Sequence, residues 1–308
     1  MIYIKEKGKL FGGGLTLISS ILWGTALIYT QYILDNGVAS KDLVSLKMFF
    51  GFLTLFIYIV IKDRTLLKVD RKGLVYSAIL GLVCHAFYNL FMFKGIEHTT
   101  ITTTVTLLYT SPIFVMLVSS LIFKEKINTN KIIALITCVV GAFLTVSAGD
   151  MESLTFNSVG ILYGLAAAIC FGSMNLINKA IVNDYKELTL LIYTLGFAFV
   201  FSLIFSNPLV LFNSQFDFLL YIFVIMTGVL STAISYLCFM KGLSYGVESG
   251  NAAIMATLEV PISVIGAVIA FGQKVVLWEI VGICLVLTSV LIINKGTLSE
   301  KTIQSSNL

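Results

Sequence analysis

One acidic residue, Glu259, lies in an otherwise apolar stretch, IMATLEVPISVIGAVIAFG (Ile254–Gly272), two positions before Pro261. A carboxylate at the centre of a membrane costs about 2.5 to 3.5 kcal/mol on insertion scales, so we expect it to face the protein interior. Two interpretations are open. Glu259 takes up and releases protons or binds a substrate amine, or it is a neutral acid that hydrogen-bonds to backbone freed by the proline.

Other apolar stretches contain polar or aromatic residues at helical spacing, for example His85, Tyr88 and Asn89. Such a stripe faces either a cavity or a neighbouring helix, so each member is a substrate contact or a helix-packing contact. His85 is either a proton relay or a partner in a helix–helix hydrogen bond. The candidates for the wall of a substrate cavity are Trp23, His85, Tyr88, Asn89, Phe171, Asn175, Asn178, Ser231, Ser235, Tyr236 and Asn251.

Two further charged residues are interpreted as structural. Lys47 is expected about five residues into a helix, where its side chain reaches the nearby membrane surface and anchors there; contact with a substrate anion is the alternative. Glu125, in the KEK turn, is expected in a solvated loop; a cap of the fifth helix or a gating ion pair is the alternative. The five cysteines occur singly, without CxxC or Cys/His spacing, so no disulfide framework, metal site or cofactor is predicted.

The composition predicts the elements that position these residues. The chain is 58% hydrophobic and 12% charged, and its mean hydropathy is +0.98, which indicates an integral membrane protein. A membrane helix needs about 20 apolar residues. By that criterion we predict an all-α fold with ten transmembrane helices near residues 10–33, 43–61, 73–93, 98–122, 130–148, 157–180, 188–206, 217–239, 246–271 and 276–294.

The basic residues predict the orientation of these helices. With the N-terminus inside, the cytoplasmic segments contain sixteen lysines and arginines and the external loops contain three. Because cytoplasmic loops are enriched in these residues, both termini are predicted to be cytoplasmic, with the chain in the cytoplasmic (inner) membrane. Direct use of ATP is not expected, since the sequence has no GxxxxGK[ST] motif.

The two halves of the sequence repeat each other. The segment LLYTSPIFVMLVSSLIFKEKI (107–127) matches LEVPISVIGAVIAFGQKV (258–275), with Pro112 on Pro261, and LWG (22–24) matches CFG (170–172). Several such matches occur in the same order at offsets of 145 to 149 residues, which indicates two copies of a five-helix unit. Because five is odd, the second copy is inverted in the membrane, as in many secondary transporters. Pro112 and Pro261 are hinge candidates.

These motifs carry a family resemblance. The early LWG, the run FKGI…TT…TSP…FKEKI and the run MKGLSYG…LEVP…FGQKV resemble the EamA family of the drug/metabolite transporter superfamily, over residues 12–294. An acidic residue that often follows the fourth helix in that family is present as Glu125, whereas its second-half counterpart is Gln273. The predicted organisation is a cytoplasmic N-terminus (1–9), two five-helix repeats (10–148 and 157–294) and a cytoplasmic tail (295–308).

The resemblance implies a secondary transporter, commonly an exporter of amino acids or related small metabolites, that works by alternating access. A membrane enzyme acting on lipid-linked substrates is the alternative. It would need carboxylates, histidines or arginines clustered near an interface, and the chain has only two arginines, Arg64 and Arg71, in one loop. The expected partners are a small-molecule substrate and the lipid bilayer, with no nucleic acid, and the expected assembly is a monomer or a homodimer.

Overall fold

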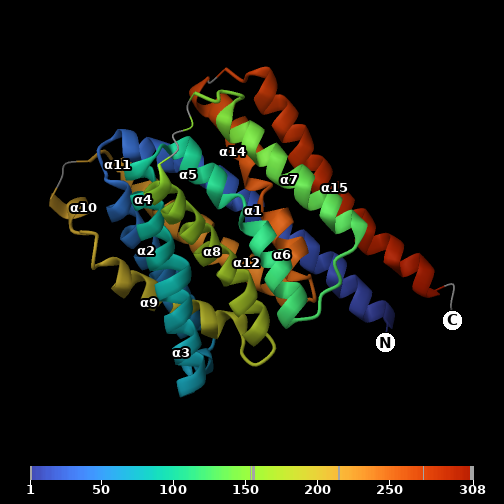
Figure 1. Cartoon of the computed structure of the whole chain (residues 1–308). Coiled ribbons are helices and arrows are strands. Elements are labelled where there is room, and N and C mark those ends of the chain that lie inside the picture. Colours follow the sequence, from blue (N-terminus) through green and yellow to red (C-terminus); the bar gives the residue numbers. More distant parts are fainter. Residues whose placement is uncertain (1, 153, 155–156, 214–215, 273, 306–308) are drawn as a thin grey trace.

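The computed structural model of the chain describes residues 2–152, 154, 157–213, 216–272 and 274–305, and every regular element in these residues is helical. Eight helices are long and apolar enough to cross a membrane, and two shorter apolar helices, Glu187–Ser202 and Leu277–Ile293, lie beside them. Figure 1 shows them packed as one bundle. The predicted all-α fold with ten transmembrane helices as two inverted five-helix repeats is therefore confirmed.

The first half contains five membrane helices, two of which are built from several pieces. Their bounds are α1 (Ile2–Asp35), α2 (Ser40–Lys62), α3 (Arg71–Ile79) continued by the π-helical segment η2 (Leu80–Phe87) and by α4 (Tyr88–His98), α5 (Ile101–Leu108) followed by α6 (Ser111–Ile122), and α7 (Thr129–Ser147). A 3-10 turn, η1 (Arg64–Leu67), joins α2 to α3.

The second half repeats this pattern. Its helices are α8 (Ser158–Ile181), α9 (Glu187–Ser202), the short α10 (Val210–Asn213), α11 (Phe218–Gly228) continued by the π-helical segment η3 (Val229–Ile234) and by α12 (Ser235–Ser244), α13 (Ser249–Ala256) followed by α14 (Glu259–Phe271), and α15 (Leu277–Ser305). The two π-helical segments occupy equivalent places in the two repeats, and such segments frequently occur at functional sites.

Helix starts follow from short polar side chains that accept hydrogen bonds from otherwise unpaired backbone N–H groups. Asp70 accepts from the N–H of Gly73 at 2.8 Å at the start of α3, and Asn128 accepts from the N–H of Lys131 at 2.9 Å at the start of α7. Asp217 does the same for α11. These caps explain why charged or polar residues mark the boundaries between apolar stretches.

The first helix of each half packs on the other half. Helix α1 lies against α11 to α14, and α8 lies against α4 to α6. A Cβ added to Gly24 of α1 would lie 2.7 Å from the carbonyl oxygen of Glu259, and one added to Gly172 of α8 would lie 2.9 Å from the ring of Phe114. The glycine of the repeated LWG and CFG motifs thus has the same role twice. It gives room for the second piece of a broken helix.

Both broken helices are interrupted just before a proline. The break between α5 and α6 precedes Pro112, and the break between α13 and α14 precedes Pro261. A proline fits the first turn of a helix because the N–H that it lacks has no intrahelical acceptor there. Both hinge candidates therefore lie beside a real interruption of helix geometry.

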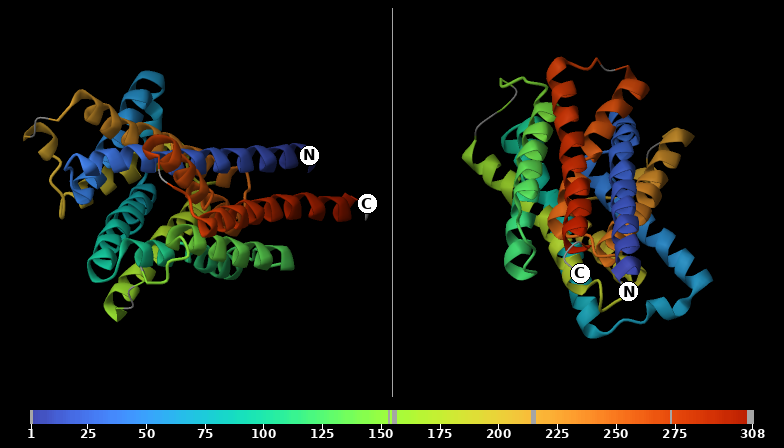
Figure 2. Two further views of the ribbon diagram at one scale, coloured as in Figure 1. Left: turned by 90° about the horizontal axis from the view of Figure 1, so that it is seen from above. Right: turned by 90° about the vertical axis from the view of Figure 1, so that its right-hand side faces the viewer.

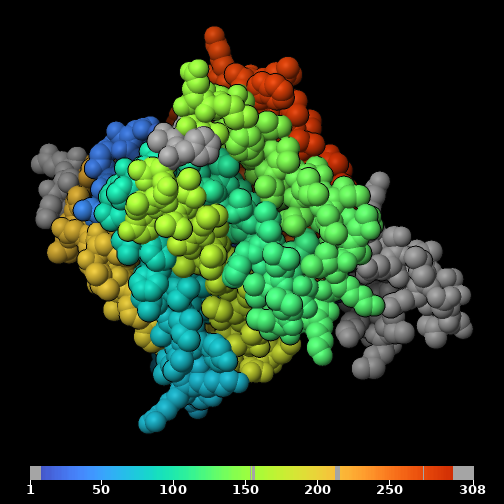
Figure 3. Space-filling view, in the orientation of Figure 1, coloured from blue at the N-terminus to red at the C-terminus, as the bar shows by residue number. Residues whose placement is uncertain are grey.

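The bundle has two ends, which we name by their contents. Both chain ends project from the same end, which we call the terminal face (Figure 2). It also holds the loops that follow α2, α6, α8 and α12, and the loop around residues 62–72 protrudes from it in Figure 3. The opposite face holds the loops that follow α1, α4, α7, α9 and α14.

Helices α7 and α15 approach each other closely through two glycines. A Cβ added to Gly141 would lie 2.8 Å from the backbone nitrogen of Val286, and one added to Gly282 would lie 2.6 Å from the carbonyl oxygen of Gly141. Small residues allow such close packing in membranes, where dispersion contacts rather than a hydrophobic effect hold helices together.

We expect Gly141→Leu to destabilise the protein by about 1 to 3 kcal/mol, because the new side chain meets backbone atoms that cannot move independently. The measurement is the free energy of unfolding, or the thermal midpoint, of purified protein in detergent. Gly14→Leu is the matched control, since a Cβ at exposed Gly14 has no neighbour within 4 Å. Equal stability of the two variants would contradict close packing of α7 on α15.

Several helix ends differ from the sequence expectation. Helix α1 begins at Ile2 rather than near residue 10, α4 continues to His98 rather than ending near residue 93, and α15 continues to Ser305. Lysine and glutamate are good helix formers, so a helix continues through charged residues after it leaves hydrocarbon. The predicted terminal segments 1–9 and 295–308 are thus helical over most of their described length.

Candidate functional site

A cavity of about 1370 Å³ lies between the two halves and is lined by the helix ends of the opposite face. One wall comes from α1 and α14, and the other comes from α2, α4 and the start of α5. The residues that line its inner part are Lys47, Tyr88, Asn89 and Ser263. Tyr88 lies roughly 15 Å along the helix from the end of α4, which is half the thickness of the hydrocarbon layer.

Beyond Tyr88, aromatic side chains from both halves form a cluster. The ring of His85 in η2 is 5.0 Å from the ring of Tyr236, which is 5.3 Å from the ring of Trp23. Tyr88 packs on Phe171 with ring centroids 5.5 Å apart. The structure therefore brings these five candidates together beside η2, whose His85 contacts Tyr236 of α12. Of the candidates, however, Tyr88 and Asn89 are the ones that line the cavity.

Glu259 is the first residue of α14 and lies beside the break between α13 and α14. Its carboxylate accepts a hydrogen bond from the hydroxyl of Tyr109, at 3.0 Å, and Tyr109 lies at the equivalent break between α5 and α6. Tyr88 and Tyr236 are close enough to interact with it electrostatically. The two broken helices are thus joined through one acid and one phenol.

Three candidate amides lie away from the cavity. The Oδ1 atoms of Asn175, Asn178 and Asn251 are buried and have no hydrogen-bond partner among the residues that the structure describes. Asn175 and Asn178 belong to the half of α8 nearer the terminal face, and Asn251 lies near the start of α13, which packs on α8. Buried amide oxygens are normally paired, so this region is unsatisfied in the present conformation.

Two candidate serines have local partners. The hydroxyl of Ser231 donates to the carbonyl of Thr227 at 2.6 Å, and that of Ser235 donates to the carbonyl of Ser231. The same Ser231 carbonyl accepts from the indole nitrogen of Trp23 at 3.1 Å. These contacts fit the helix-packing interpretation of Ser231 and Ser235 rather than a role in the cavity wall.

Lys47 corrects an expectation from the sequence. We predicted that it anchors at the membrane surface, but it is the eighth residue of α2, which begins at Ser40, and it lines the inner part of the cavity. The helix starts earlier than hydropathy indicates, because Lys41 and Asp42 occupy its first turn. Lys47 is therefore deeper, and its side chain faces the cavity.

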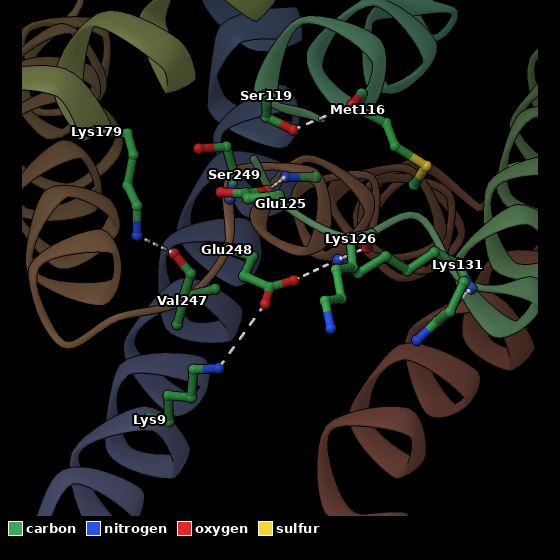
Figure 4. A network of polar contacts seen from close by, with 12 residues as sticks. Lys9, Met116, Ser119, Glu125, Lys126, Lys131, Lys179, Val247, Glu248 and Ser249 are labelled. Carbon is green, nitrogen blue, oxygen red and sulfur yellow. Dashed lines mark hydrogen bonds and ion pairs between the residues drawn. The ribbon is translucent and has the colours of Figure 1, made fainter. Parts of the chain in front are cut away.

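The terminal face beneath the cavity is closed by polar contacts between the halves (Figure 4). Glu248, in the loop between α12 and α13, pairs with Lys131 of α7, and its other oxygen lies 3.9 Å from the Nζ atom of Lys9. Lys131 also donates to the carbonyl of Lys126 at 2.6 Å. We call Lys9, Glu125, Lys126, Lys131, Lys179, Val247, Glu248 and Ser249 the closure network.

Glu125 corrects a second expectation. Instead of lying in a solvated loop, its carboxylate accepts from the backbone N–H groups of Ser249, at 3.0 Å, and Gly250, at 3.4 Å. These groups begin α13, so a side chain from the first half caps a helix of the second half. Lys179 of α8 donates to the carbonyl of Val247 at 3.0 Å. Gln273, the counterpart of Glu125, lies outside the described residues.

A second set of contacts joins α3 to the loop after α8 on the same face. The hydroxyl of Tyr185 donates to Asp70 at 2.7 Å, and Lys72 lies 3.2 Å from Asp184. The N–H of Gly73, together with the hydroxyl of Tyr185, holds the pKa of the Asp70 carboxyl below its usual range. Asp70 therefore stays ionised at neutral pH and accepts both bonds.

Sequence reasoning did not find Tyr109, Glu248 or Lys131. Tyr109 precedes Thr110, the repeat counterpart of Glu259, so the repeat alignment held a usable signal for it. Glu248 lies in a loop and Lys131 in the first turn of α7, more than a hundred residues away, and no spacing in the sequence relates them.

Known proteins share this architecture. A solved structure, titled only as a crystal structure of a protein, superimposes with a TM-score of 0.75 at 14% identity and covers 91% of this chain and 95% of its own. At that identity the likeness concerns the fold. The family whose sequence profile matches is described as the EamA-like transporter family, and it matches residues 10–147 and residues 158–295. The chain therefore belongs to the EamA-like transporter family and is a multi-pass membrane transporter.

Curated relatives are similar over most of their length. A Bacillus subtilis (strain 168) protein named uncharacterized transporter YxxF is 23% identical, over 88% of this chain and 85% of its own. An uncharacterized transporter of Archaeoglobus fulgidus is 24% identical, over 92% and 96%. The Salmonella typhimurium protein named uncharacterized inner membrane transporter YicL is 22% identical, over 90% and 93%.

Proposed function

We propose that this protein is a secondary transporter that exports amino acids or related small metabolites across the cytoplasmic membrane by alternating access. The observation that carries the proposal is the asymmetry between the two faces. A cavity between the halves reaches the middle of the bundle from the opposite face, while the closure network holds the terminal face shut.

The terminal face is cytoplasmic in this proposal, because its loops contain most of the lysines and arginines. The present conformation is then open to the outside. To open the terminal face instead, the contacts of Glu125 and Glu248 with the other half would be lost. The helix interruptions before Pro112 and Pro261 would then allow α6 and α13 to tilt.

The unsatisfied amide oxygens support the second conformation. Asn175, Asn178 and Asn251 lie between the aromatic cluster and the closure network, on helices that pack together. If the terminal face opens, water or substrate reaches these oxygens and supplies the missing hydrogen bonds. The stripes of candidates on α8 and α13 then line the inward cavity, as Tyr88 and Asn89 line the outward one.

Transport by the purified protein in liposomes tests the proposal. We expect at least one member of a mixed amino-acid and metabolite pool, loaded inside, to leave protein-containing vesicles faster than protein-free vesicles. A leak control with an impermeant sugar excludes vesicle rupture. If no member of a broad pool moves, in either direction and with or without a pH gradient, the proposal is wrong.

A further inference from the structure

Lys47 is a cation placed unusually deep in the cavity. It lies seven residues after the start of α2, which is roughly 10 Å along the helix axis. Its neighbours in the chain, Leu46 and Met48, are 3% and 1% exposed, so the backbone here is enclosed by protein. The lysine side chain itself faces the space shared with Tyr88 and Asn89.

No described residue neutralises this charge. Lys47 forms no ion pair and no hydrogen bond with the residues that the structure describes, and the imidazole of His85, which lies within range of its charge, supplies no negative charge. By contrast, Lys94, at the cavity mouth, pairs with Glu97 at 2.7 Å. Asp35, also at the mouth, accepts from Gln31 at 2.7 Å.

An ammonium group at this depth is destabilising unless water or an opposite charge compensates it. The Lys47 ammonium has no partner among the described residues, and it faces a cavity that opens to solvent. We propose that Lys47 binds the carboxylate of the transported molecule, so the substrates are small organic carboxylates. This inference rests on the proposed transport function and specifies its substrate class.

The other side chains that line the cavity indicate the chemical character of the rest of the substrate. Around Lys47 the cavity is lined by aliphatic and aromatic side chains: Leu27, Ile28, Leu43, Val44, Phe93 and Val264. Such walls suit an apolar substrate body, with one polar group that fixes its orientation. A lysine is a point charge rather than a planar fork, and a single one matches a monocarboxylate better than a phosphate dianion.

Matched probe pairs test the assignment by binding, without any need for transport. Phenylalanine and phenylalaninamide differ in the carboxylate, as do leucine and leucinamide. We expect purified wild-type protein to bind the carboxylate of at least one pair about tenfold or more tightly than its amide, measured by calorimetry. Lys47→Met should abolish this preference, and Lys47→Arg should keep most of it, because the arginine retains the charge.

Lys94→Met is the matched control, since it removes a lysine of the same cavity that already has a carboxylate partner. It should leave the preference unchanged. Gel filtration and the thermal midpoint of each variant establish that it is folded. The inference is overturned if wild type binds the members of every pair equally, or if folded Lys47→Met keeps the preference.

The two proposals fail in different ways. If liposomes export compounds without regard to a carboxylate, the protein is a transporter and the assignment of Lys47 is wrong. If the purified protein selects carboxylates through Lys47 but moves none of them across a membrane, the assignment stands and the transport mechanism is wrong.

Discussion

Replacing the buried acid, Glu259→Gln, is expected to abolish the dependence of substrate accumulation on a pH gradient. One pH unit corresponds to 1.36 kcal/mol, so a transporter that exchanges one proton per substrate can accumulate it about tenfold per unit of gradient. Glutamine keeps the size of the side chain and can still accept from Tyr109, but it cannot take up a proton. Accumulation by the variant should therefore fall to the level set by the substrate gradient alone.

The surroundings of Glu259 make it a suitable proton site. The titratable groups that face it are three tyrosines, Tyr88, Tyr109 and Tyr236, and no described lysine or arginine pairs with it. The carboxyl group therefore has a hydrogen-bond donor in its ionised form, yet no permanent counter-charge that would keep it ionised. Loss of a proton on one side of the membrane and gain on the other requires this balance.

The measurement uses reconstituted protein with an imposed pH gradient, for wild type, Glu259→Gln and a control acid. Glu97→Gln is the control, because Glu97 lies at the mouth of the same cavity and pairs with Lys94. It should retain gradient-driven accumulation. If Glu259→Gln accumulates substrate as wild type does, the glutamate belongs to the bend before Pro261, which is the second interpretation that the sequence left open.

Charge reversal in the closure network, Glu248→Lys, is expected to open the terminal face. The change places a third ammonium between Lys9 and Lys131, so two attractions become repulsions. A hydrogen bond to a charged group contributes about 1.5 to 3 kcal/mol, and each 1.4 kcal/mol is a factor of ten in a conformational equilibrium. We therefore expect the population that is open at this face to rise by about tenfold or more.

Thiol labelling reports this opening directly. Ser249 is fully buried at the start of α13, so Ser249→Cys in a background without the five native cysteines should react slowly with a membrane-impermeant maleimide. Adding Glu248→Lys should speed the reaction about tenfold. Glu187→Lys makes the same change of charge at the start of α9, outside the closure network, and should leave the rate unchanged. Equal rates in both variants would mean that Glu248 does not hold the face closed.

Much of the architecture was predictable from the sequence by itself. The apolar runs gave the ten membrane helices, since a bilayer without water requires long, internally hydrogen-bonded segments. The repeat of LWG and CFG, and of Pro112 and Pro261, indicated two inverted halves. Hydropathy failed at the helix ends and at the two π-helical segments, because neither feature changes the apolar character of the chain.

The residues of the candidate site were predictable from the sequence only in part. Polar spacing identified His85, Tyr88 and Asn89, and a single charge in an apolar stretch identified Glu259; the fold gathers all four near the middle of the bundle. Tertiary structure alone decided which of them face the cavity, that Lys47 is inside it rather than at the surface, and that Glu125 and Glu248 close the terminal face. The physical reason is that helical periodicity shows which side chains share a stripe. What that stripe faces depends on the packing of helices that are distant in the sequence.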